Sequence, residues 1–160
     1  MENFSSLPAT LPELHAQATP AKSRHRLDNT KRKGELSEAA FVLKASSLAF
    51  GVAKPWGDSE RYDFILDSGH RLWRVQLKCT DALRARGYDV QPIYSIYGQG
   101  KRVYTANDID VLVVHIVPLD VWYVLPVAAF SPCKSLRFYP DAPCKRARFE
   151  HFREAWHLLR

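Results

Sequence analysis

The sequence predicts an α/β fold in which a mixed central sheet is flanked by helices. Three observations carry this prediction: a helical segment that ends near Ala49, a pair of short strands between residues 62 and 79, and a continuous apolar run from Val111 to Val117. A chain of 160 residues, of which 46% are apolar, has enough material for one hydrophobic core. We therefore expect one folded domain over residues 31–160, preceded by a flexible basic arm over residues 1–30.

Charge and cysteine content narrow the classes of partner and compartment. The formal net charge is +6, which favours a polyanion such as nucleic acid as a partner. Cys79, Cys133 and Cys144 have no Cys-x-x-Cys spacing, which argues against both a disulfide framework and a zinc ribbon. No apolar run approaches the roughly 20 residues that span a bilayer. We expect a cytoplasmic protein that is associated with the nucleoid and not with a membrane.

The N-terminal segment is polar and then strongly basic. Residues 1–21 are rich in Ser, Pro, Ala and Thr, a composition that buries too little surface to fold alone. From Lys22 to Lys33, six of twelve residues are Lys or Arg, against one acid, Asp28. Two interpretations stay open for this run: a solvated charged segment, or a clamp on phosphates that gains affinity by counterion release.

The first helix is predicted from Thr30 or Lys31 to Ala49, with Gly51 as its stop signal. At about 100° per residue, its buried stripe centres about 95° from Glu35 and about 155° from Glu38. Glu35 should therefore lie at the edge of the buried face, within reach of the sheet, whereas Glu38 should point to water. The residues assigned to that buried stripe are Leu36, Ala39, Ala40, Leu43 and Ser47.

A short strand near Val52 to Lys54 and a turn-rich loop over residues 55–60 precede two strand-like runs, Tyr62 to Asp67 and Arg71 to Cys79. In the second run, Trp73, Val75, Leu77 and Cys79 alternate with Leu72, Arg74, Gln76 and Lys78, the period of two that is typical of a strand. Gln76 and Lys78 must therefore share one face.

The register of this hairpin places a third residue on that face. If Ser68 and Gly69 are the two loop residues, Asp67 pairs with His70 and, counting back, Asp63 pairs with Arg74. Asp63 then lies on the face of Gln76 and Lys78. An odd-length loop would move Asp63 to the opposite face, because a slip of one residue turns every side chain over.

The second half of the chain supplies the rest of the sheet. Residues 80–92 are predicted as a polar loop, followed by a strand from Ile93 to Tyr97 and a turn at Gly98 to Gly100. Val111 to Val117 is predicted as a strand buried on both faces, paired with Val121 to Leu125. Phe149, Phe152, Trp156 and Leu159 predict an amphipathic C-terminal helix whose apolar stripe packs in the core or against another copy of the chain.

Three further features are assigned mainly to structure. His115 is interpreted as a hydrogen-bonded core histidine, and Asp110 as a capping or turn residue rather than a site acid. For the tyrosines near Lys101 and Arg102, contact with nucleic acid and simple packing remain equally open; they are Tyr94, Tyr97 and Tyr104.

The expected constellation suits metal-assisted hydrolysis. Mg²⁺ prefers oxygen ligands, so Asp63, the amide oxygen of Gln76 and a nearby Glu35 form a plausible sparse site. Such an ion polarises a phosphodiester oxygen and lowers the pKa of a bound water. Lys78 would orient that water and stabilise charge on the phosphorus.

An acid in the first helix, Tyr62-Asp63 and the run Val75-Gln76-Leu77-Lys78 together resemble the PD-(D/E)XK nuclease superfamily. The resemblance extends from about Gly34 to Pro126. Within the superfamily, the sequence is similar in particular to the branch of a cyanobacterial group I intron homing endonuclease, in which Gln replaces the usual acid before the lysine. Archaeal Holliday-junction resolvases are similar more distantly. The resemblance implies a restriction-endonuclease-like α-β-β-β-α-β core.

Two departures from the common superfamily pattern bear on the site. Arg61-Tyr62 precedes Asp63 in place of proline, a position that varies across the superfamily. Gln76 replaces the usual acid and removes one negative charge, so we expect weaker metal affinity or a single well-held ion.

The residues and the resemblance together imply a Mg²⁺-dependent DNA endonuclease, with Mn²⁺ as an alternative ion. A Holliday-junction resolvase or nicking repair nuclease, and a catalytically degenerate DNA-binding module, are the alternatives. Because one such site cuts one strand, double-strand cleavage implies a homodimer or homotetramer. The expected DNA contacts are Lys22, Arg24, Arg26, Lys31, Arg32, Lys33, Arg84, Arg86, Lys101 and Arg102.

Overall fold

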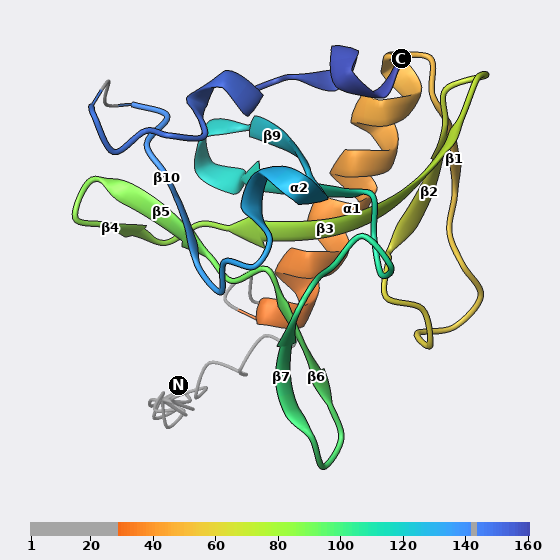
Figure 1. Ribbon diagram of the computed structural model, residues 1–160. Helices are drawn as coiled ribbons and strands as arrows, with labels where there is room; N and C mark the ends of the chain where they lie inside the picture. Colours follow the sequence, from red (N-terminus) through yellow and green to blue (C-terminus); the bar gives the residue numbers. More distant parts are fainter. Residues whose placement is uncertain (1–28, 142–143) are drawn as a thin grey trace, which may run out of the picture.

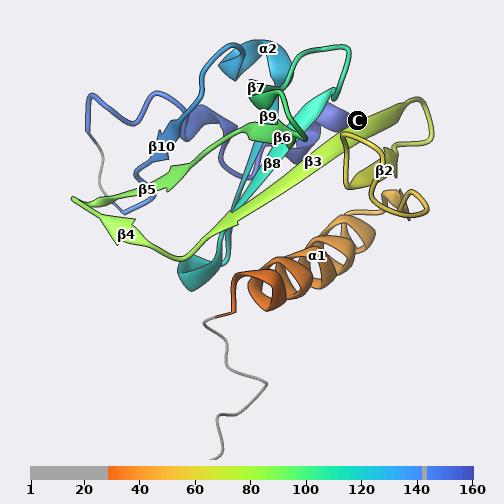
Figure 2. The same ribbon diagram turned by 90° about the horizontal axis from the view of Figure 1, so that it is seen from below.

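A five-stranded sheet in the order β1-β2-β3-β8-β9 forms the centre of the computed structural model, which describes residues 29–141 and 144–160 (Figure 1). The long helix α1 (Thr30–Ser47) lies against one face of this sheet (Figure 2). The strands are β1 (Gly51–Ala53), β2 (Phe64–Asp67), β3 (Leu72–Thr80), β8 (Val111–Ile116) and β9 (Val121–Pro126). Because β3 and β8 are parallel and the other neighbours antiparallel, the sheet is mixed, as predicted.

Smaller elements connect and cover this sheet. A three-stranded sheet has the order β10-β5-β4, and β6 and β7 form a separate two-stranded sheet. These strands are β4 (Leu83–Arg84), β5 (Gly87–Val90), β6 (Ile93–Ile96), β7 (Gly100–Val103) and β10 (Leu136–Phe138). The short helical turns are η1 (Val117–Leu119), α2 (Val127–Phe130), η2 (Glu150–Phe152) and η3 (Trp156–Leu159). None of the helices within the described residues is long and apolar enough to cross a membrane.

The crossover between β3 and β8 is built from strands. A parallel pair needs a long connection, for which a helix is usual. Here β4 to β7 and a turn over residues 105–108 make that connection, in place of the helix that the α-β-β-β-α-β pattern implied. The prediction of a polar loop over residues 80–92 is wrong because Tyr88 and Val90 are buried core residues and β5 pairs with β10.

Helix α1 starts where the sequence predicted and ends slightly earlier. The side chain of Asn29 accepts a hydrogen bond from the Lys31 N–H at 3.0 Å, which caps the first turn. The helix ends at Ser47 rather than at Ala49, whose φ of 65° belongs to the left-handed region. The chain then reverses into β1, and the Phe50 N–H donates to the Ala45 carbonyl at 3.1 Å.

The buried face of α1 differs from the predicted stripe. Ser37, Phe41 and Ala45 are buried, whereas Leu36 is 48% exposed and Leu43 is 73% exposed. Phe41 decides the rotation because its ring packs 4.7 Å from that of Phe64, centroid to centroid, and also lies against Trp122 and Trp156. The predicted face relied on leucines that lie on the surface, so its prediction is wrong.

The β2–β3 hairpin has a longer loop than predicted. Asp67 pairs with Leu72, so residues 68–71 form the loop, and Asp67 does not pair with His70. Hydrogen bonds within the loop close it: the Ser68 N–H donates to the Arg71 carbonyl at 3.0 Å, and Asp67 Oδ1 accepts from the Gly69 N–H at 2.7 Å. This loop is two residues longer than expected and still even in length, so the predicted shared face survives.

The core lies on both faces of the central sheet. Every residue of β8 is buried, which confirms the prediction of a strand covered on both sides. One face carries Val75, Leu77, Val111 and Val113 against α1 and the C-terminal turn η3. The opposite face carries Leu112, Val114 and Ile116 against side chains from β5, α2 and β10.

The predicted amphipathic C-terminal helix is wrong. Residues 149–160 form two short 3-10 turns, because the segment between them is attached to the edge of the sheet. Arg153 makes an antiparallel bridge with Tyr123, and the Glu154 N–H donates to the Trp122 carbonyl at 2.7 Å. A continuous helix would need those backbone groups for itself. The apolar residues nonetheless pack in the core, where Phe149, Trp156 and Leu159 are buried.

Candidate active site

Asp63 stands at the end of the β2–β3 ladder. The last paired residues are Phe64 and Val75, and the Asp63 N–H still donates to the Val75 carbonyl at 2.9 Å. Beyond this point the Asp63 side chain replaces a backbone acceptor: its Oδ2 accepts from the Leu77 N–H at 2.8 Å. The ladder therefore holds the carboxylate against β3.

Gln76 and Lys78 join Asp63 on the same face of β3. Continuing the register by one step places Asp63 opposite Gln76, where the notional two-residue loop had placed it opposite Arg74. Gln76 is only 6% exposed, and its Nε2 donates to Asp63 Oδ2 at 2.5 Å and to the Leu77 carbonyl at 3.1 Å. Lys78 lies two residues further along, with its Nζ 5.8 Å from the centre of the Tyr104 ring.

The acid that α1 brings to this region is Glu38. Taking about 100° per residue, Glu38 lies about 60° from the buried Phe41 and Glu35 about 120° from it. Glu38 is half-buried and forms an ion pair with Lys54 at 2.5 Å, whereas Glu35 is exposed. The expectation that Glu35 faces the site and Glu38 faces water is therefore reversed, because Phe41 sets the rotation of the helix.

Glu38 and Asp63 open into one cleft. The cleft has a volume of about 180 Å³, and charged side chains dominate its wall. Its lining residues are Glu38, Lys54, Pro55, Gly57, Asp58, Glu60, Tyr62 and Asp63. Sequence reasoning missed Lys54 and Glu38 as partners; the signal that could have found them is Phe41, the bulkiest apolar residue of the helix.

Burial shifts the pKa values of the two charged groups in opposite directions. It raises the pKa of Asp63, although the hydrogen bond from the Leu77 N–H and the charge of Lys78 act against this rise. Burial lowers the pKa of Lys78, and here the charge of Asp63 opposes the fall. The pKa of Lys54 is raised by its hydrogen bond to Glu38. The shifts at Asp63 and Lys78 favour the neutral form of a poorly solvated group, whereas the shift at the exposed Lys54 favours its charged form.

The donor set suits a hard divalent cation. Asp63 and Glu38 offer two carboxylates to one cleft, and a cation bound by both would compete with the Lys54 ammonium for Glu38. Within the described residues, no three His, Cys, Asp or Glu side chains gather closely enough to hold a metal by themselves. A cation here would therefore need an uncharged oxygen and waters in addition to the two acids, and the amide of Gln76 would have to turn its oxygen toward Asp63.

The expected DNA contacts are spread over several surfaces. Lys22, Arg24 and Arg26 lie outside the described residues. Lys31 is exposed and Arg32 is half-buried at the start of α1, whereas Lys33 is engaged in an ion pair with Asp81. Arg84 and Arg86 are exposed on the β4–β5 hairpin, and Lys101 and Arg102 are exposed on β7.

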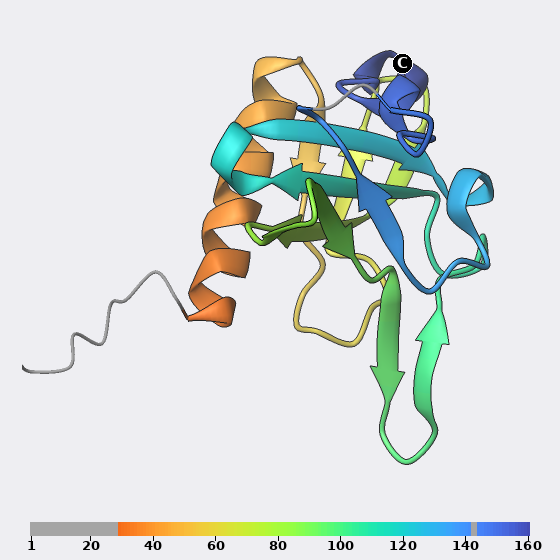
Figure 3. The same cartoon turned by 90° about the vertical axis from the view of Figure 1, so that its left-hand side faces the viewer.

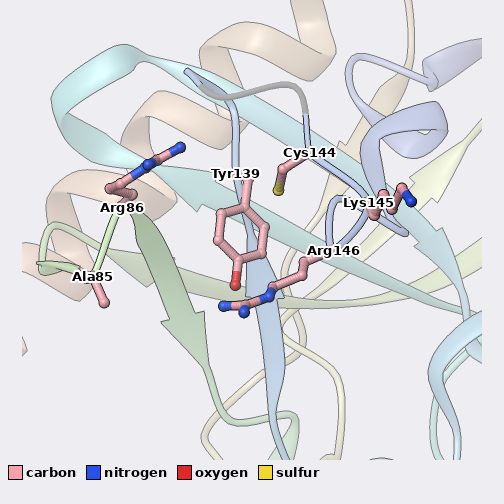
Figure 4. Close-up of a pocket in the computed structure, with 6 residues that line it drawn as sticks. All are labelled: Ala85, Arg86, Tyr139, Cys144, Lys145 and Arg146. Atoms are coloured by element: carbon pink, nitrogen blue, oxygen red, sulfur yellow. The ribbon is translucent and has the colours of Figure 1, made fainter.

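Arg86 belongs to a basic pocket away from the Asp63 cleft. The pocket has a volume of about 330 Å³, and Tyr139 lies between Arg86 and Arg146 in it (Figure 4). Ala85, Cys144 and Lys145 complete its lining. Within the described residues, none of its three basic side chains forms an ion pair, so this surface could contact a phosphate.

Two residues that could have been site groups have structural partners. His115 is buried, stacks on Trp122 with ring centroids 3.8 Å apart, and shares a hydrogen bond with Ser37 Oγ at 2.9 Å. This confirms the interpretation of a satisfied core histidine, and burial lowers its pKa. Asp110 accepts from the Arg74 N–H at 2.8 Å and pairs with the Arg74 guanidinium, so its role is structural, but as an ion-pair partner of β3 rather than the expected capping or turn residue.

Comparisons with known proteins identify the family and support the fold. A family model described as PD-(D/E)XK endonuclease matches residues 28–159, which span every described element from α1 to η3. Among solved structures, the chain is similar to a bacterial homing endonuclease, I-Ssp6803I, with a TM-score of 0.73 and 30% identity; the match covers 82% of this chain and 93% of that chain. Comparison with curated proteins returned no match.

Proposed function

Because the chain belongs to the PD-(D/E)XK endonuclease family and is therefore a nuclease, we propose that it hydrolyses phosphodiester bonds of double-stranded DNA in a Mg²⁺-dependent reaction. One observation carries the proposal: Asp63, Gln76 and Lys78 share a face of the β2–β3 hairpin, and Glu38 reaches the same cleft. In the proposed site, Glu38 replaces Glu35 as the acid from the helix.

Asp63 and Glu38 are the proposed carboxylate ligands of the cation. Their oxygens match the ligand preference of Mg²⁺, which keeps several waters, and Mn²⁺ would accept the same donors. The cation would supply charge stabilisation at the phosphate and a more acidic water. Gln76 contributes no charge; its amide holds the Asp63 carboxylate in place and is the proposed third ligand once it turns its oxygen inward.

Lys78 is the proposed partner of the reacting phosphate. Its burial lowers the energetic preference for the charged form, and the nearby carboxylate of Asp63 restores part of it. An ammonium group in that setting can hydrogen-bond the attacking water and stabilise negative charge that develops on the phosphate oxygens. Tyr104, which lies under the Lys78 ammonium, limits the positions that the side chain can adopt.

Homing-endonuclease-like cleavage of both strands is the proposed outcome. Each site cuts one strand, so we propose a homodimer or homotetramer that brings two sites to one DNA. The exposed basic residues of β4, of the β4–β5 turn and of β7, with Lys31, Arg32 and the basic arm, are the proposed phosphate contacts.

Cleavage of supercoiled plasmid DNA tests this function. Wild-type protein with Mg²⁺ should convert supercoiled plasmid into nicked and then linear forms, whereas Asp63→Ala and Lys78→Ala should not. Both variants should keep DNA binding, measured by gel shift in EDTA, because Asp63 and Lys78 are half-buried and neither is one of the proposed phosphate contacts. Lys134→Ala, which removes an exposed charge far along the sequence, is the matched control and should cut like wild type.

The outcomes also separate the alternatives. If either site variant cuts at the wild-type rate, the proposed site is wrong. Wild-type protein that binds DNA but never cuts it with Mg²⁺ or Mn²⁺ would contradict the proposed nuclease activity and favour a degenerate DNA-binding module. This alternative follows from Gln76, which replaces the usual acid and removes one negative charge from the site. Preferred cleavage of four-way junctions over linear duplex would favour a junction resolvase.

A further inference from the structure

The β6–β7 hairpin is a ribbon that stands apart from both larger sheets. Within the part of the chain that the structure describes, its strands pair only with each other, from Ile93 with Val103 to Ile96 with Gly100. Figures 1 and 3 show it projecting from the body of the molecule with its turn at the far end. A lone two-stranded hairpin is marginally stable in water, so its retention as a projection points to a function.

The tip of this ribbon is polar, basic and sterically open. Tyr97 is 103% exposed, and Gln99 and Lys101 are exposed beside it. Residues 91–103 contain no acid. Gly98 and Gly100 have φ of 72° and 81°, and a Cβ added at either would meet nothing within 4 Å, so these glycines serve the turn conformation rather than close packing.

The base of the ribbon is attached to the proposed active site. The Tyr94 ring packs 5.0 Å from the Tyr104 ring, and Tyr104 lies under the Lys78 ammonium at 5.8 Å. The Arg61 guanidinium lies over the Tyr94 ring, 4.5 Å from its centre. Arg61 lies two residues before Asp63, so the ribbon contacts the segment that leads into Asp63 as well as the Tyr104 ring beside Lys78.

We propose that the β6–β7 ribbon enters the major groove of the DNA substrate and reads base edges with Gln99 and Lys101. The inference rests on the proposed nuclease function and adds the element that selects the sequence to be cut. Gln side chains pair with adenine and Lys side chains with guanine through edges that the major groove exposes. The exposed ring of Tyr97 adds an apolar contact at the tip.

The dimensions of the ribbon fit this role. Four strand residues at about 3.3 Å each carry the tip roughly 13 Å beyond the base. The major groove is about 12 Å wide and about 8.5 Å deep, and it admits a two-stranded ribbon. A ribbon anchored next to Lys78 can therefore reach the floor of the groove while the cleft engages the sugar-phosphate backbone at its edge.

The composition of the ribbon favours DNA over a protein partner. An arm that packs on another protein copy would need an apolar face, yet the exposed positions near the tip are Ser95, Gln99, Lys101 and Arg102, with Tyr97 as the one large apolar group. Basic and amide side chains with no acid complement a groove lined by phosphates and base-edge acceptors.

Selection from a randomised duplex library tests the proposal. Full-length protein is incubated in EDTA with duplexes that carry a randomised central region, and bound duplexes are recovered and sequenced over several rounds. The variants are Gln99→Ala and Lys101→Ala, and Lys134→Ala is the control because it removes the same charge from an exposed loop outside the ribbon. Chemistry is switched off by EDTA, so the measurement does not depend on the Asp63 site.

The expected result is a local change in base preference. Wild-type protein and Lys134→Ala should enrich the same sequence, and each ribbon variant should lose discrimination at one or two adjacent positions by about 5-fold to about 150-fold, the range for one paired base contact. Light-scattering masses of all variants should equal that of wild type.

Several results would overturn the proposal. One is a wild-type protein that binds DNA without enriching a sequence, and another is a set of ribbon variants that keep the wild-type base preference. Ribbon variants that bind every sequence more weakly by one common factor would show that the ribbon contacts phosphates only. A changed oligomeric mass in the ribbon variants would make it a protein-binding arm. Failure of the nuclease function is a separate result, seen as wild-type protein that enriches a sequence but never cuts it with Mg²⁺ or Mn²⁺.

Discussion

Asp63 and Asp110 are both anchored to β3 by a backbone N–H, yet their electrostatic environments are opposite. Asp110 accepts from the Arg74 N–H at 2.8 Å, and Asp63 accepts from the Leu77 N–H at 2.8 Å. Asp110 also lies 3.1 Å from the guanidinium of Arg74 and 3.4 Å from that of Arg71. Asp63 has an amide and a half-buried lysine as neighbours instead.

The difference indicates a structural role for Asp110 and a metal-binding role for Asp63. Although burial alone would raise the pKa of Asp110, the hydrogen bonds and charge of Arg74 lower it below its ordinary value. Burial raises the pKa of Asp63, and the hydrogen bond from the Leu77 N–H and the charge of Lys78 offset this rise only in part. Two arginines, Arg71 and Arg74, form ion pairs with the Asp110 carboxylate. The Asp63 carboxylate accepts hydrogen bonds from Gln76 and the Leu77 N–H instead, so a bound metal ion would add the positive charge that stabilises it.

The largest expected contrast between the two acids is in catalysis. Asp63→Asn should lower the rate of plasmid cleavage at saturating Mg²⁺ by at least about 10²-fold, the loss that follows removal of one electrostatic group at a transition state. Asp110→Asn should change this rate by less than about 3-fold, because the ion pairs of that acid within the described residues are with Arg71 and Arg74. Similar losses in both variants would contradict the assignment of separate roles.

A second contrast distinguishes two acids on α1. Glu38→Gln should raise the Mg²⁺ concentration needed for half-maximal cleavage by about 10-fold or more, because it removes a carboxylate from the cleft. Glu35→Gln should leave this concentration within about 2-fold of wild type, since its side chain is exposed one turn away. The measurement is a Mg²⁺ titration of the initial cleavage rate. A larger effect at Glu35 than at Glu38 would mean that the helix presents its other side to the metal.

Stability should respond to the two Asn variants with opposite signs. In EDTA near neutral pH, Asp110→Asn should lower the free energy of unfolding by about 1–3 kcal/mol, because it weakens charged hydrogen bonds to Arg74. Asp63→Asn should unfold at the same denaturant concentration as wild type or a higher one, because the variant no longer confines a charge in a poorly solvated place. Urea denaturation followed by tryptophan fluorescence measures both. A destabilised Asp63→Asn protein would show that the carboxylate is well satisfied without metal.

The smallest expected effects concern pH. The folded pKa of Asp110 is lowered, so its stabilisation is complete above the unfolded pKa of roughly 3.9 and is lost as pH falls through the folded value. For Asp63 the folded pKa is raised, so its favourable contribution is present below the unfolded pKa and is lost as pH rises through the folded value.

Urea denaturation in EDTA between about pH 3 and pH 7 checks both signs. The stability difference between wild type and Asp110→Asn should shrink toward low pH. Any advantage of Asp63→Asn over wild type should appear only as pH rises from the acid end. If the two differences change in the same direction with pH, the contrast between the acids is wrong.

Strand pattern carried most of what could be predicted about this site. Alternation from Leu72 to Cys79 was enough to place Gln76 and Lys78 on one face, and an even-length loop was enough to add Asp63. The loop itself was two residues longer than predicted, since Ser68 and Asp67 bond back to the loop backbone, but an even error leaves the faces unchanged. The buried strand β8 was likewise predicted from neighbouring residues alone, because it coincides with a continuous apolar run.

Helical and terminal segments were predicted less well. The rotation of α1 depends on which of its apolar residues packs in the core, and Phe41 packs against rings from distant parts of the chain: Phe64, Trp122 and Trp156. The C-terminal segment has helical spacing in its apolar residues, yet its backbone pairs with Trp122 and Tyr123. The strand β5 was missed because its burial depends on pairing with β10, and the exposed strand β4 was missed because it forms only by pairing with β5.

Local sequence was sufficient for the α/β class, for the apolar strands and for the shared face of Asp63, Gln76 and Lys78, because a period of two depends only on neighbouring residues. The long-range packing of the fold determined that Glu38 rather than Glu35 reaches the cleft, that Arg74 neutralises Asp110 while Asp63 stays available, and that the β6–β7 ribbon projects beside Lys78. The physical reason is that helix rotation, charge pairing and desolvation depend on partners from distant parts of the chain, which no local pattern records.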